Sequence, residues 1–76
     1  MTIADLKLNQ SGKIISINGK GFLRHRLMEM GFTPQTIVTL TKVAPFGDPL
    51  ELTIRNYEIS IRKEDASLIE IAEIKR

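Results

Sequence analysis

The chain has 76 residues, a formal net charge of +2 and no cysteine. This length predicts one small domain, residues 1–76, whose core supplies only about 3–5 kcal/mol of net stability. The absence of cysteine excludes disulfides and thiolate metal sites. The low net charge gives little basis for nucleic-acid binding. No signal-peptide pattern and no apolar run of ~18 residues is present, so we expect a cytoplasmic protein.

One helix is predicted, over residues 20–30. Leu23, Leu27 and Met30 recur at the i, i+4, i+7 spacing of a buried helical face. Gly31 follows at the position where a left-handed C-cap residue is favoured, so the helix should end there.

Five segments are rich in β-branched residues or alternate apolar with polar side chains, which is typical of strands. They are residues 13–18, 36–43, 50–54, 57–61 and 68–74. In the first segment we expect Ile15 and Ile17 to share a face, and in the second we expect Val38 and Leu40 to point inward. This orientation does not account for two other apolar residues of the second segment, Ile37 and Val43. A bend in the strand or cover by the helix would explain them.

The third and fourth strands predict a hairpin with a two-residue turn at Arg55-Asn56. Its register places six apolar side chains on one face. The pairs are Leu50 with Ile61, Leu52 with Ile59, and Ile54 with Tyr57.

Short single-turn elements complete the pattern. We expect Thr2 to cap a short turn in which Ile3 and Leu6 share a face, a helical turn over residues 63–66, and a frayed end at residues 75–76. Five short strands with one short helix predict a mainly β fold, a small barrel of SH3-like or OB-like form. The short hairpin and the single turn before the last strand favour the SH3-like form.

A stiff loop over residues 43–50 joins the second and third strands. Pro45 has no N–H to give to a sheet, and Gly47 allows a positive φ. The loop carries Phe46 close to Asp48. Phe46 either folds over the mouth of the barrel, which the tendency of large aromatics to be buried favours, or anchors a partner. Asp48 either accepts hydrogen bonds from its own loop, the favoured interpretation, or contacts a partner.

The sequence contains no P-loop and no nucleophile motif, and its only histidine is His25. We therefore expect no enzymatic activity and no cofactor. His25 and Glu29 are four residues apart on the helix and are weak metal-ligand candidates, because two ligands do not make a tight site. Arg24, Met28 and Glu29 lie off the apolar stripe. This face is either solvated, with Met28 filling a gap in the packing, or in contact with a partner.

Three stretches of the chain closely resemble the FeoA family, ferrous iron transport protein A. They are Leu23 to Pro34, Ala44 to Pro49, and Tyr57 to Lys63. The leucine-rich helix ending in Met-Gly, followed by Ala-Pro-x-Gly-Asp-Pro, is a specific combination. The resemblance implies an SH3-like barrel without catalytic residues that assists the membrane ferrous iron transporter, whose cytoplasmic part is G-protein-like. The chain lacks the DNA-binding portion that accompanies a related domain in iron-dependent repressors, so we expect the stand-alone form.

The chain departs from the family pattern at two turn positions. The family usually has glycine after Thr-Pro, where this chain has Gln35, and it often has glycine before the tyrosine, where this chain has Asn56. A type II turn would force a positive φ on Gln35, which is costly, so we expect a different turn there.

These observations predict a non-catalytic accessory protein that binds and regulates the ferrous iron transporter through its G-protein-like domain. It would reach the membrane only through that partner. The predicted contact combines Phe46 and Asp48 of the loop with Arg24, Met28 and Glu29 of the helix. The alternative is an iron-linked regulatory or nucleic-acid-binding SH3-like module. Exposed strand edges are also compatible with a homo-oligomer.

Overall fold

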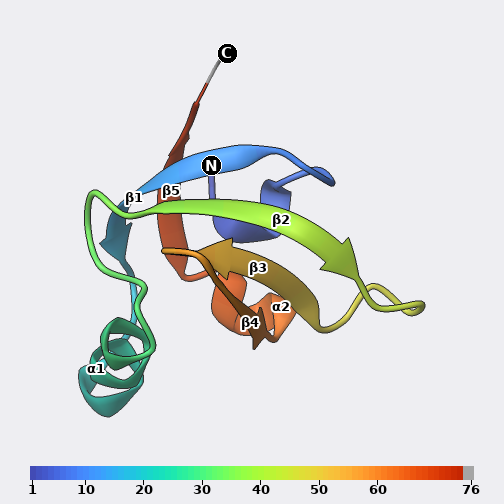
Figure 1. Ribbon diagram of the computed structural model, residues 1–76. Coiled ribbons are helices and arrows are strands. Elements are labelled where there is room, and N and C mark those ends of the chain that lie inside the picture. The colour runs from blue at the N-terminus through green and yellow to red at the C-terminus, as the bar shows by residue number, and fades with distance from the viewer. Residues whose placement is uncertain (75–76) are drawn as a thin grey trace.

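The computed structural model describes residues 1–74, so the fraying expected at residues 75–76 lies outside the described residues. Five antiparallel strands form one curled sheet in the order β4-β3-β2-β1-β5 (Figure 1). The strands are β1 Ser11–Ile17, β2 Ile37–Val43, β3 Leu50–Ile54, β4 Tyr57–Ile61 and β5 Ile69–Glu73. The helical elements are η1 Ile3–Asp5, α1 Gly21–Glu29 and α2 Lys63–Ala66. Because β4 and β5 are the two ends of the sheet and do not pair within residues 1–74, the barrel is open.

One apolar core is enclosed by the curled sheet and its short helical elements. Its largest fully buried side chains come from both halves of the chain, and they are Phe32, Ile3, Ile14, Leu27, Leu40, Leu52, Ile54, Ile69 and Val38. Val38 and Leu40 therefore point inward as predicted. Ile37 and Val43 stay exposed, and the β2–β3 register shifts between Leu40 and Lys42. The helix does not cover Ile37, which leaves half of that side chain in water.

The β3–β4 hairpin forms in the predicted register, with Leu50, Leu52 and Ile54 opposite Ile61, Ile59 and Tyr57. Arg55 and Asn56 both adopt a positive φ, +47° and +71°, as a two-residue type I′ turn requires. Tyr57 is the exception to the expected burial. It is half exposed, and its hydroxyl donates to the Met30 carbonyl at 3.2 Å.

Strand β1 contains an irregularity that alternation did not predict. The β1–β5 register shifts between Ile14 and Ser16, which is a β-bulge. A bulge puts one extra residue into the strand and thereby changes which side chains face inward. Ile14 and Ile17 are buried while Ile15 is 54% exposed, so the expectation that Ile15 and Ile17 share a face is wrong.

Helix α1 ends as the sequence predicts. Gly31 has φ +114°, and the N–H groups of Gly31 and Phe32 donate to the carbonyls of Met28 and Leu27, each at 3.1 Å. This is the Schellman pattern. A Cβ at Gly31 would lie 2.8 Å from the Tyr57 hydroxyl, so both the φ and the space require glycine.

The turn after α1 contradicts the expectation for Gln35. Gln35 has φ +77°, and the Thr36 N–H donates to the Thr33 carbonyl at 3.2 Å, as in a type II turn. The Gln35 N–H also donates to the Ile14 carbonyl at 2.8 Å. Pairing with β1 therefore holds this turn in a conformation that glutamine alone disfavours.

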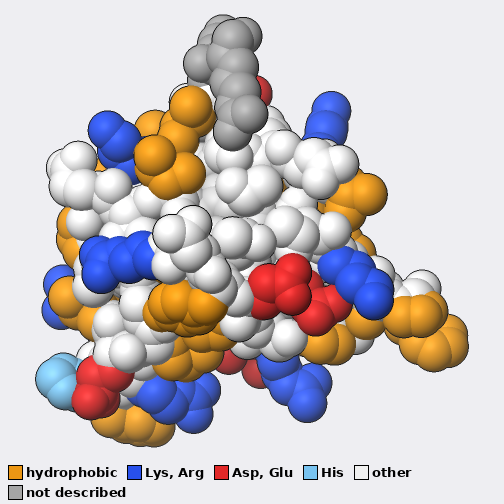
Figure 2. Space-filling model, viewed as in Figure 1, with side chains coloured by type: hydrophobic (Ala, Val, Ile, Leu, Met, Phe, Trp, Pro, Cys, Tyr) orange, Lys and Arg blue, Asp and Glu red, His pale blue; other side chains and the backbone are white. Residues whose placement is uncertain are grey.

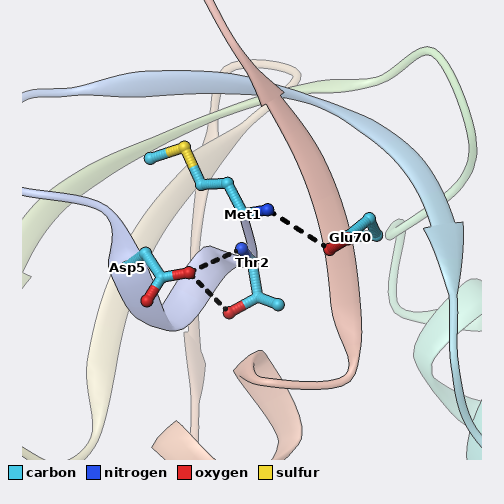
Figure 3. Close-up of polar contacts among 4 residues, drawn as sticks. All are labelled: Met1, Thr2, Asp5 and Glu70. Carbon is cyan, nitrogen blue, oxygen red and sulfur yellow. Dashed lines mark hydrogen bonds and ion pairs between the residues drawn. The ribbon is translucent and has the colours of Figure 1, made fainter.

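The N-terminal segment covers part of the outer edge of β5 (Figure 3). The Asp5 carboxylate accepts the Thr2 N–H at 2.8 Å, and the Ile71 N–H donates to the Met1 carbonyl at 2.8 Å. The terminal ammonium of Met1 lies 3.6 Å from the Glu70 carboxylate. Ile3 and Leu6 of this turn are buried, as the sequence indicates.

Candidate partner-binding surface

The loop between β2 and β3 projects from the body of the molecule (Figure 1). Its base is closed by the Ala44 N–H, which donates to the Pro49 carbonyl at 3.1 Å. Its tip is a turn in which the Gly47 N–H donates to the Ala44 carbonyl at 2.8 Å. Pro45 takes the second position of that turn, where its fixed φ is favoured. The projecting loop is therefore ordered by its own backbone hydrogen bonds.

Phe46 lies at the tip of this loop and is 99% exposed. The space-filling view shows apolar side chains at the end of the projection, on the right (Figure 2). The favoured interpretation, that Phe46 folds over the mouth of the barrel, is wrong. The turn between Ala44 and Gly47 places residue 46 at the far end of the loop, away from the core. A phenylalanine left in water forgoes about 1.5–3 kcal/mol of burial free energy.

Asp48 has a structural role that the sequence did not indicate. Its Oδ1 accepts the N–H of Lys63, the first residue of α2, at 2.8 Å. A carboxylate at a helix N-terminus satisfies a donor that has no partner inside the helix. The bond expected within the loop itself is absent from residues 1–74, and Asp48 instead attaches the base of the loop to α2.

Helix α1 carries the other predicted residues. Arg24, His25 and Glu29 are exposed, whereas Met28 is half-buried and packs against the core, as the gap-filling interpretation predicted. His25 Nε2 lies 3.6 Å from Glu29 Oε1. Within residues 1–74 no group of three histidine, cysteine, aspartate or glutamate side chains is placed to hold a metal. The pair alone offers two exposed ligands.

The structure does not bring the five predicted contact residues together. The loop with Phe46 lies on one side of the molecule and α1 lies on the other (Figure 1). Helix α1 instead presents an aromatic residue that the sequence interpretation missed, Phe22, which is 82% exposed. The sequence feature that indicates this exposure is the position of Phe22 next to Leu23, off the buried stripe of the helix. Phe22 and Phe46, the two most exposed aromatic side chains of residues 1–74, thus lie on separate parts of the molecule.

Within the described part of the chain, no helix has the length and apolar character needed to cross a bilayer.

The curled five-stranded sheet with short helical elements defines a small SH3-like domain. The structure of Stenotrophomonas maltophilia FeoA complexed with zinc, described as a prokaryotic SH3 domain protein, superposes with a TM-score of 0.83 at 24% identity. The alignment covers 95% of this chain and 89% of that one. This likeness confirms the predicted SH3-like fold.

The FeoA domain profile matches residues 1–73, so the chain belongs to the FeoA family, which is associated with ferrous iron transport. The iron(II) transport protein A of Clostridium thermocellum is 34% identical with a TM-score of 0.92, over 97% of this chain and 46% of that one. An Fe(2+) transport protein A/Fe(2+) transporter FeoB fusion protein of Porphyromonas gingivalis is 35% identical over 71 residues. That match takes in 93% of this chain, which spans only 8% of the fusion protein. The resemblance seen in the sequence is thereby confirmed.

Proposed function

We propose that this protein is a non-catalytic accessory of ferrous iron uptake that binds the cytoplasmic G-protein-like domain of a membrane ferrous iron transporter and regulates it. Membership of the FeoA family supports the link to iron transport. In the Porphyromonas gingivalis fusion protein a region similar to this chain belongs to the same polypeptide as a transporter. The protein accordingly works in the cytoplasm, at the inner face of the membrane, through its partner.

The exposure of Phe46 on an ordered loop is the observation that carries this proposal. Exposed aromatic side chains that become buried on association supply much of the binding energy of protein interfaces. The loop is held by two backbone bonds and by the bond from the Lys63 N–H to Asp48, so little of its freedom is lost on binding. Burial of Phe46 would contribute about 1.5–3 kcal/mol, or roughly 10- to 100-fold in affinity.

Asp48 enters this proposal as a positioning residue, because it fixes the base of the loop. The α1 face with Arg24, Met28 and Glu29 is too far from Phe46 to share a small contact with it. We assign this face to a second region of the partner, which a large domain can reach while Phe46 is engaged.

Calorimetric titration into the purified cytoplasmic domain of the transporter tests the proposal. Phe46→Ala should weaken binding about 10- to 100-fold. Ile15→Ala is the matched control, because it removes an exposed apolar side chain of β1 that lies outside both the loop and the α1 face assigned to the partner, and it should leave binding unchanged. Both variants should unfold at the wild-type temperature. Absence of wild-type binding together with unaltered GTP hydrolysis would contradict the function, and equal affinity of Phe46→Ala would contradict the assigned contact.

A further inference from the structure

A second surface lies at the other end of the β2–β3 pair from the loop with Phe46. It is an open hollow of about 360 Å³ between the segment that leads into β2 and the β3–β4 turn. Its lining residues are Pro34, Gln35, Thr36, Ile37 and Arg55. Because β2 and β3 are antiparallel, the start of β2 and the end of β3 share this end of the sheet.

The Arg55 guanidinium is held in the hollow by two threonine hydroxyls. Its Nη2 donates to Thr33 Oγ1 at 3.2 Å and to Thr36 Oγ1 at 3.1 Å, and these two oxygens lie 2.8 Å apart. Thr36 is buried, so one side of this arrangement belongs to the protein interior. The Arg55 side chain makes no other hydrogen bond and no ion pair within residues 1–74. The cation is fixed in place without an acidic partner.

On the side of Arg55 that faces β2 and β1, the neighbouring exposed side chains are apolar and cationic. Lys13 in β1 is the register partner of Ile37, and the pairing of Val38 with Ile54 places Ile37 beside Arg55. Lys13, Ile37 and Arg55 therefore form a row across the exposed side, about 10 Å long at the usual strand spacing. Ile37 is 51% exposed, and none of the residues that line the hollow is acidic.

Two lining residues adopt backbone conformations that their side chains disfavour. Arg55 has φ +47° and Gln35 has φ +77°. Asparagine or glycine would adopt the left-handed conformation with less strain. Strain of this kind concentrates at ligand sites, where the surrounding structure holds it. Arg55 is thus both one of the two strained residues and the only cationic residue among those that line the hollow.

We propose that this hollow binds an acidic segment of a partner protein. A carboxylate of the segment pairs with the remaining N–H groups of Arg55, a second is attracted by Lys13, and an apolar side chain between them packs on Ile37. Charge complementarity favours this occupant, because two cations flank an exposed isoleucine with no nearby lining acid. The site is separate from the Phe46 loop and does not depend on the transporter assignment.

NMR titration of the whole chain at low salt tests this site with a blocked hexapeptide, acetyl-Ser-Glu-Leu-Leu-Glu-Ser-amide. The shifts should be confined to the amides of residues 33–37 and 55–56 and to Lys13. Arg55→Asn keeps a residue that tolerates the turn and should weaken binding about tenfold. Arg62→Asn is the matched control, because it removes an exposed arginine at the far end of the same hairpin and should have no effect.

The competing occupants are distinguished by parallel titrations. The peptide in which both glutamates are glutamine should not bind, and inorganic phosphate and a thymidine hexanucleotide should bind more weakly than the acidic peptide. Equal binding of the glutamine peptide, unchanged affinity in Arg55→Asn, or no shifts at the hollow would each overturn the proposal. Tighter binding of the oligonucleotide or of phosphate would overturn the assignment to an acidic protein segment.

Discussion

Replacing Asp48 with alanine removes the bond that attaches the projecting loop to α2. The Asp48 Oδ1 lies 2.8 Å from the Lys63 nitrogen at the start of a four-residue helix. Loss of a capping side chain costs about 0.5–2 kcal/mol, and the weak dipole of so short a helix keeps the value near about 1 kcal/mol. In a domain of this size that free energy lowers the unfolding temperature by about 4–8 °C. Asp48→Asn keeps an oxygen acceptor without the charge and should lie between alanine and wild type.

Thermal unfolding followed by circular dichroism measures this loss. Glu58→Ala is the matched control, because Glu58 is an exposed carboxylate with no hydrogen bond or ion pair in the described part of the chain. It should change the free energy of unfolding by less than about 0.5 kcal/mol. If Asp48→Ala and Glu58→Ala unfold at the same temperature, the Asp48–Lys63 bond does not secure the loop, and the rigid presentation of Phe46 loses its support.

Two further substitutions test the fold. Gln35→Gly relieves a φ of +77° while its N–H bond to Ile14 stays, so the free energy of unfolding in urea should rise by about 0.5–1 kcal/mol; a decrease would contradict the assigned strain. Phe32→Ala empties the largest fully buried position and should cost about 3–5 kcal/mol, comparable to the whole stability of so small a domain. Its NMR spectrum should lose dispersion, and a native-like spectrum would show that the core does not depend on this ring.

Local patterns predicted the parts of the fold that depend on neighbouring residues. The hairpin register follows from strict alternation and from a turn that asparagine tolerates, so Leu52 and Ile59 pair as expected. The end of α1 follows from the apolar stripe and Gly31. The same stripe indicated which side of α1 would be exposed, and it thereby placed Arg24 and Glu29 correctly in solvent.

The errors arose where distant parts of the chain decide the local structure. The β-bulge that β1 forms against β5 exposes Ile15, although the alternation within its own segment predicted that Ile15 shares a face with Ile17. Pairing with β1 holds Gln35 at a positive φ that a turn in isolation would disfavour. For Phe46, the general tendency of aromatics to be buried was outweighed by a turn whose hydrogen bonds direct the residue outward. The hydrogen-bond donor to Asp48 is the Lys63 N–H, fifteen residues further along the chain, and no local motif indicates this contact.

The antiparallel β2–β3 pair sets the distance between the two proposed binding surfaces. The loop with Phe46 joins the end of β2 to the start of β3, whereas Arg55 follows the end of β3 beside the start of β2. Seven residues of β2 separate them, which at the usual rise amounts to about 20–23 Å. A ligand at the hollow therefore cannot touch Phe46 unless it also crosses the length of the sheet. The apolar contact and the ionic contact can thus serve different partners, or different parts of one partner that is large enough to span the domain.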